Sequence, residues 1–201
     1  KIKQGIMQLS SVQPKYRILN FTFQWVLVTF LGFLSSLLMI EISEKPDMSM
    51  MEAAMGSLAI AIPQSYLLRK AISPVKWVLS TLIPWVITAG IGIGVLGWTV
   101  TTTNFLPMRI INGIIVGGIG GLLIGISQWW LAIPPAFPSA WTWLFVNIMS
   151  WIVAVPIGST VGLFLHKITN VFLAEVVGLA ITWLLVAIFT GIAAVRIMKD
   201  L

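Results

Sequence analysis

Long apolar stretches, separated by short polar breaks, make up most of this sequence. They cover residues 18–41, 50–69, 76–99, 109–133, 140–165 and 171–196. A helix rises 1.5 Å per residue, so each stretch can cross roughly 30 Å of hydrocarbon. The pattern predicts an all-α integral membrane protein with six transmembrane helices in residues 18–196. A short N-terminal segment (1–17) precedes this bundle and a C-terminal tail (197–201) follows it.

Prolines indicate where the longest uncharged stretch of the sequence is divided into two helices. The stretch from Ile110 to Leu165 carries no charged residue, but it contains Pro134, Pro135 and Pro138. Prolines at this density cannot continue a helix. Two predicted helices therefore meet there.

The composition agrees with a membrane location. Hydrophobic residues make up 58% of the 201 positions and charged residues only 9%, whereas a soluble domain is about 25% charged. Lipid must therefore cover much of the surface. The net charge of +6 comes from Lys and Arg at helix ends and forms no continuous basic face, so we do not expect nucleic acid as a partner.

The distribution of Lys and Arg predicts an orientation. Three of the 12 lie on one predicted side, at Lys45, Arg109 and Lys167. The other nine lie on the opposite side, at Lys1, Lys3, Lys15, Arg17, Arg69, Lys70, Lys76, Arg196 and Lys199. Positive residues favour the cytoplasmic side. Both termini are therefore predicted to be cytoplasmic.

An internal repeat divides the bundle into three hairpins. Residues 25–33, 77–85 and 143–151 each begin with Trp, end with an aromatic residue and carry Thr or Asn at the fifth place. In the returning helices, 56–64 matches 120–128, and both end in Gln; the sixth helix lacks this glutamine. Repeats that point the same way are related by an axis along the membrane normal. We therefore predict a quasi-threefold bundle.

Packing is the simpler interpretation of single glycines in this pattern. Glycines recur four residues apart in three helices, at Gly90-Gly94, Gly113-Gly117-Gly121-Gly125 and Gly158-Gly162. Such spacing lets helix backbones approach closely within lipid.

Polar residues inside the apolar stretches are the candidates for a site, because burying them in lipid is costly. Gln64, Gln128 and Asn147 lie at repeat positions, and His166 is the only histidine. These four residues are candidate pigment or lipid contacts, with chlorophyll, carotenoid or lipid as the expected cofactor. The alternative for the amides is a hydrogen bond between helices, which contributes about 0.6 kcal/mol. Glu175 is expected to reach the interface or to pair with Lys167.

No catalytic pattern is present in the sequence. It has no cysteine, no Gly-x-Ser-x-Gly motif and no cluster of His with acidic residues. The chain is therefore predicted not to be an enzyme.

One motif resembles a known group of proteins. Gln128-Trp-Trp-Leu131 closes a glycine-spaced helix, and the next helix opens with Trp-x7-Trp. Over roughly residues 20–195 the chain resembles uncharacterised multi-span membrane proteins common in cyanobacteria. The resemblance implies a thylakoid or plasma membrane setting.

Together these features favour a non-enzymatic accessory or scaffold subunit. We expect such a subunit to pack against a larger membrane protein complex, including a photosynthetic one, with bound lipid or pigment. The alternative is a small-solute transporter or substrate-capture subunit, for which Pro84 and Pro156 would supply broken helices.

Overall fold

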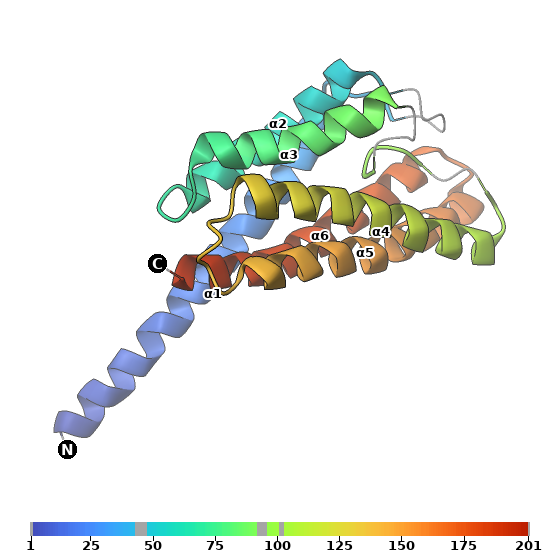
Figure 1. The fold of residues 1–201 in the computed structure, drawn as a ribbon. Helices are drawn as coiled ribbons and strands as arrows, with labels where there is room; N and C mark the ends of the chain where they lie inside the picture. Colours follow the sequence, from blue (N-terminus) through green and yellow to red (C-terminus); the bar gives the residue numbers. More distant parts are fainter. Residues whose placement is uncertain (1, 43–47, 92–95, 101–102, 201) are drawn as a thin grey trace.

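The protein is all-helical. The computed structural model describes residues 2–42, 48–91, 96–100 and 103–200, with side chains from residue 18 onward. Six helices lie in this part of the chain (Figure 1). Their bounds are α1 (Ile2–Ser36), α2 (Met50–Leu68), α3 (Pro74–Gly90), α4 (Leu106–Leu131), α5 (Ala140–Thr169) and α6 (Leu173–Lys199).

The six helices form a ring. Each packs against its neighbours in the chain, and α6 also packs against α1. The N-terminal part of α1 projects well beyond the other helices (Figure 1). The closed ring has an axis, and side chains that point inward from different helices meet there.

Four helices are long and apolar enough to cross a membrane. They are residues 18–36 of α1 together with α4, α5 and α6. The helix α2 has 19 residues and contains Glu52 and Gln64, and α3 has only 17 residues. The bounds of α4, α5 and α6 agree with the predicted spans to within four residues.

The prediction of one helix over 76–99 is wrong. The helix α3 ends at Gly90, where the sequence becomes rich in glycine, and glycine is a poor helix former. Residues 96–100 instead form a turn with Leu96, Trp98 and Val100 buried. We call this segment the 96–100 turn.

The 96–100 turn closes one end of the ring. Trp98 Nε1 donates a hydrogen bond to Ser36 Oγ at 2.8 Å, and Trp183 Nε1 donates to the carbonyl oxygen of Gly97 at 2.9 Å. Gly97 has φ +93°, and an added Cβ would lie 2.8 Å from Nε1 of Trp183. Only glycine adopts this backbone conformation without strain. The turn is therefore fixed by both its backbone and its neighbours.

Helix ends follow local sequence signals. Ser49 and Glu52 form a reciprocal capping box at the start of α2, and Pro74 occupies the first turn of α3. Asn170 ends α5 in the left-handed conformation with φ 54°. The N-terminus of α5 is capped from a distance, because Asp200 accepts hydrogen bonds from the backbone N–H and the hydroxyl of Ser139.

Glycine spacing serves close helix packing, as the sequence predicted for α4 and α5. A Cβ on Gly117 would meet the backbone of Trp151, and one on Gly158 would meet the backbone of Gly178. Gly90 lies against the side chain of Met50, and Gly94 is outside the described residues.

Candidate functional site

Three tryptophans meet on the axis of the ring. Trp25 comes from α1, Trp77 from α3 and Trp143 from α5, and each is at most 1% exposed. Their ring centroids lie 5.4 to 6.0 Å apart, with the rings edge to face. This arrangement is favourable for aromatic pairs. We call these residues the tryptophan triad.

A second aromatic layer lies farther along the axis. Trp85 and Trp151 follow members of the triad by eight residues, which corresponds to about 12 Å along a helix. Both contact Trp183 of α6, with centroids 6.1 and 5.1 Å from its ring. The two layers enclose a short section of the axis.

Gln64 links three helices in that section. Its Nε2 donates to Thr29 Oγ1 of α1 at 2.8 Å, and its Oε1 accepts from Trp77 Nε1 of α3 at 3.3 Å. The side chain is 6% exposed. Gln64 of α2 therefore joins the helix before it in the chain, α1, to the helix after it, α3.

Gln128 of α4 makes the same two kinds of bond to the helices on either side of it, α3 and α5. Its Nε2 donates to Thr81 Oγ1 at 3.0 Å, and its Oε1 accepts from Trp143 Nε1 at 3.0 Å. Asn147 Nδ2 lies 3.5 Å from the same Oε1 and 3.5 Å from the carbonyl oxygen of Trp143. The structure thus brings Gln64, Gln128 and Asn147 to one level of the bundle.

Thr190 occupies the corresponding position on α6. Its Oγ1 accepts from Trp25 Nε1 at 3.1 Å and donates to the carbonyl oxygen of Val186 at 2.7 Å. Thr190 was not predicted, because α6 has no glutamine at this place in the repeat. Its spacing is the signal in the sequence, since Thr190 follows an aliphatic residue by four places, as both glutamines do.

These side chains line a cavity of about 40 Å³ on the axis. All six helices contribute to the wall, mostly at positions of the sequence repeats, and Trp183 of α6 lies beside Trp85 and Trp151 without a counterpart in them. Its residues are Trp25, Trp77 and Trp143; Thr29, Thr81 and Asn147; Ile60, Ile124 and Val186; Gln64, Gln128 and Thr190; and Trp85, Trp151 and Trp183. We call the amides and hydroxyls among them the polar belt.

The cavity fits a small ligand only. Sites for drug-sized molecules occupy roughly 300–1,000 Å³, so a cavity of about 40 Å³ is too small for a chlorophyll ring or a carotenoid. The belt itself carries no charged group. Its chemistry is that of neutral hydrogen-bond donors and acceptors.

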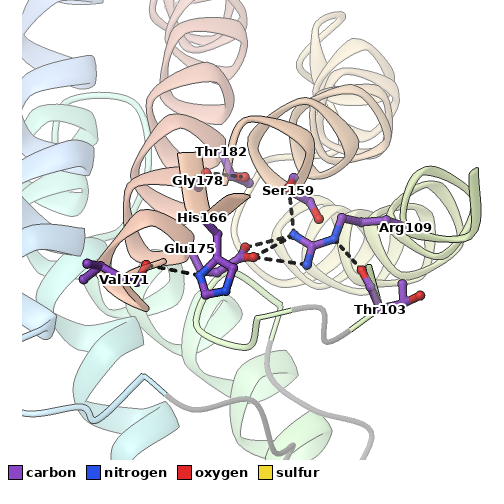
Figure 2. Close-up of polar contacts among 8 residues, drawn as sticks. All are labelled: Thr103, Arg109, Ser159, His166, Val171, Glu175, Gly178 and Thr182. Atoms are coloured by element: carbon purple, nitrogen blue, oxygen red, sulfur yellow. Dashed lines mark hydrogen bonds and ion pairs between the residues drawn. The ribbon is translucent and has the colours of Figure 1, made fainter. Parts of the chain in front are cut away.

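An ion pair lies elsewhere in the bundle (Figure 2). Arg109 of α4 and Glu175 of α6 are 1% and 7% exposed, and Nη1 lies 2.9 Å from Oε2. A second nitrogen, Nη2, donates to Oε1 at 3.1 Å. Arg109 also donates to the carbonyl oxygens of Thr103 and Ser159, both at 2.9 Å. The pair therefore joins α4, α5 and α6.

The expected pairing of Glu175 with Lys167 is wrong. Lys167 is exposed, whereas Glu175 points inward to Arg109. The predicted span of residues 109–133 places Arg109 at a helix boundary. The helix α4 begins three residues earlier, at Leu106, and this places Arg109 on its inner face.

His166 does not belong to the polar belt. It is partly exposed near the end of α5, and its Nδ1 lies 3.2 Å from the carbonyl oxygen of Val171. Figure 2 shows it at the same end of the bundle as the ion pair. In the described ranges no three His, Asp or Glu side chains lie close enough to hold a metal ion.

Comparisons with known proteins add no identification: no protein family, curated protein or solved structure matches this chain.

Proposed function

We propose that this chain is an integral membrane protein that acts as a non-enzymatic accessory or scaffold subunit of a larger membrane complex. All six helices would lie in the bilayer as three hairpins about a quasi-threefold axis, with both termini cytoplasmic. Lipid would cover the outer wall wherever the partner does not.

The polar belt supports the threefold arrangement. Gln64 and Gln128 make equivalent bonds to equivalent residues, and Thr190 receives the third tryptophan N–H. A chance similarity of composition would not place the members of each set around one cavity. The short α2 and α3 are then spans held in the bilayer by their neighbours in the ring.

The outer wall supports a membrane location. Along α4 the exposed side chains are large and aliphatic at helical spacing: Ile111, Ile115, Ile119, Leu122 and Ile126. Contiguous exposed apolar surface of this kind is typical of contact with lipid or with another protein.

One observation carries the scaffold role: the interior has no room for a large ligand. The triad, the second aromatic layer and the 96–100 turn leave only the axial cavity of about 40 Å³ between them, and the glutamines are bonded within the protein. The surface that remains for a partner is the apolar outer wall. Helices associate within lipid through close packing of such walls.

Purification from native membranes in mild detergent tests this role. We expect cross-links, read by mass spectrometry, between the outer wall and a constant membrane partner, and an absorption spectrum would report any co-purified pigment. Isolation of the chain with lipid alone, under conditions that keep other membrane complexes intact, would contradict the proposal.

The absence of cysteine from the sequence makes the topology directly testable. Single cysteines at Lys70 and Lys199 should be labelled from the cytoplasmic side, and those at Glu41 and Lys167 from the other side. All four positions are exposed. Labelling of Glu41→Cys and Lys199→Cys from the same side would contradict the proposed topology.

A transport function is the second candidate, and one observation favours it. A groove of about 50 Å³ opens between α3 and α4, and it shares Trp85 and Ile124 with the axial cavity. These two residues therefore separate the cavity from the lipid side. If solutes pass there, Ile124→Trp should abolish swelling of reconstituted vesicles in a permeant solute. Ile115→Trp should not, because Ile115 is exposed on the outer wall and lines neither the groove nor the axial cavity. No swelling by the native protein with any small solute would exclude this candidate.

A further inference from the structure

The hydrogen bonds of the polar belt are interrupted between Asn147 and Thr190. In the first two copies a glutamine bridges a threonine of its own hairpin and a tryptophan of the next hairpin. In the third copy the threonine is replaced by Asn147 and the glutamine by Thr190. The Thr190 side chain is shorter than that of glutamine, and among the described residues it shares no hydrogen bond with Asn147.

Asn147 has unused hydrogen-bonding capacity at this joint. Its Nδ2 makes two contacts of 3.5 Å, at the long limit for a hydrogen bond. No hydrogen bond from the described residues reaches its Oδ1, although the residue is only 3% exposed and lines the cavity. Among the described side chains, the fully buried polar atom without a partner is Ser159 Oγ. The Oδ1 of Asn147 instead keeps accessible surface at the cavity, where a ligand can donate a hydrogen bond to it.

The cavity offers the missing partner enough room and enough contacts. A water molecule needs roughly 10–15 Å³ of such space and about three polar neighbours, and the cavity provides about 40 Å³. Thr190 Oγ1 retains a free lone pair, and each glutamine Nε2 retains a second N–H. The donors and acceptors are balanced and uncharged, so the site favours a neutral molecule over an ion.

We propose that the axial cavity is a binding site for water, and that one water molecule joins Asn147 to Thr190. This water donates to Asn147 Oδ1 and to Thr190 Oγ1, and it accepts from Gln128 Nε2. The belt then continues through all six helices. This site depends on the cavity alone and is independent of the scaffold role.

Nuclear magnetic resonance of isotope-labelled protein in lipid nanodiscs tests the site. The probe is water itself, detected by cross-peaks from water to the side-chain amide of Asn147 and to Nε1–H of Trp25. We expect both cross-peaks in the native protein. They should persist in Ser150→Ala, because the Ser150 hydroxyl bonds to the carbonyl oxygen of Asn147 and does not line the cavity.

The double variant Asn147→Thr/Thr190→Gln restores the pattern of the other copies. A direct bond then replaces the water, and the cross-peak to Trp25 should be lost. If the double variant does not fold, Asn147→Leu replaces it in the test, since it places an apolar side chain between Gln128 and Thr190. Absence of the cross-peaks from the native protein would overturn the proposal, as would their survival in a folded filled variant.

Discussion

The polar belt and the Arg109–Glu175 pair bury polar groups in the same apolar bundle by different means. The belt uses neutral amides and hydroxyls, spread over all six helices. The ion pair concentrates two full charges at one place between α4 and α6. Neutral groups are cheaper to remove from water than ions, so they can be repeated around an axis.

The position of Arg109 in its helix is electrostatically unfavourable for a positive charge. Arg109 lies in the first turns of α4, where the helix dipole favours negative charge. Glu175 lies in the first turn of α6, where the same dipole favours it. Arg109 therefore depends on Glu175 and on two carbonyl oxygens. We expect loss of one partner to be far more damaging here than in the belt.

Breaking the ion pair should have the largest effect. Arg109→Met leaves the Glu175 carboxylate buried without its cation, and Glu175→Gln leaves the guanidinium uncompensated. Each should lower the free energy of unfolding by roughly 3–5 kcal/mol, measured by denaturant titration in micelles.

The double variant Arg109→Met/Glu175→Leu provides the control for the ion pair. It removes both charges, so most of the stability should return. A double variant as unstable as the single ones would show that the damage comes from packing. Lys167→Met, at an exposed position, should change stability by less than about 0.5 kcal/mol.

Removing one glutamine from the belt should have a smaller effect. Gln128→Leu breaks bonds to Thr81 and Trp143 and leaves the indole N–H of Trp143 unpaired. The expected loss is about 1–2 kcal/mol, read by the same titration. If Gln128→Leu lowers the free energy of unfolding as much as Arg109→Met does, the proposed difference between the neutral belt and the ion pair is wrong.

Gln64→Leu should cost less than Gln128→Leu. The bond from Trp77 to Gln64 is 3.3 Å long, against 3.0 Å from Trp143 to Gln128, and Gln64 makes no contact like that with Asn147. We expect a loss of about 0.6 kcal/mol, near the mean for such bonds in membranes. A greater loss than in Gln128→Leu would contradict this ranking.

Completing the belt should have the smallest effect, and the opposite sign. Asn147→Thr/Thr190→Gln replaces a water bridge by direct bonds at a gain of up to about 1 kcal/mol. The matched control is Asn147→Thr alone, which removes the amide without supplying a bridging glutamine and should not gain stability. Thermal unfolding in nanodiscs distinguishes the two variants.

Much of the site was visible in the sequence because helical spacing alone determines it. Residues four and eight apart share a helix face, so each copy of the repeat presents its tryptophan and its polar residue on one side of its helix. The repeat also predicted that Trp25, Trp77 and Trp143 lie at matching places, and these residues do meet. Gln64 and Gln128 also lie at one level of the bundle. The ion pair could not be found this way, because 66 residues separate its members and no repeat relates them.

The end of α3 was mispredicted for another reason. Residues 96–100 are apolar apart from Thr99, and hydropathy does not distinguish a lipid-crossing helix from a buried turn. Two details of the 96–100 turn carry the missing information: the positive φ of Gly97 and the hydrogen bond of Trp98 to Ser36. Both depend on tertiary contacts.

Closure of the ring between α1 and α6 has a consequence for biosynthesis. The bond from Trp25 to Thr190 joins residues 165 positions apart. At roughly 5–20 residues per second, translation delivers the second residue on the order of ten seconds after the first. During that interval the nascent chain lacks Thr190, so the indole N–H of Trp25 cannot make this bond until α6 has been synthesised.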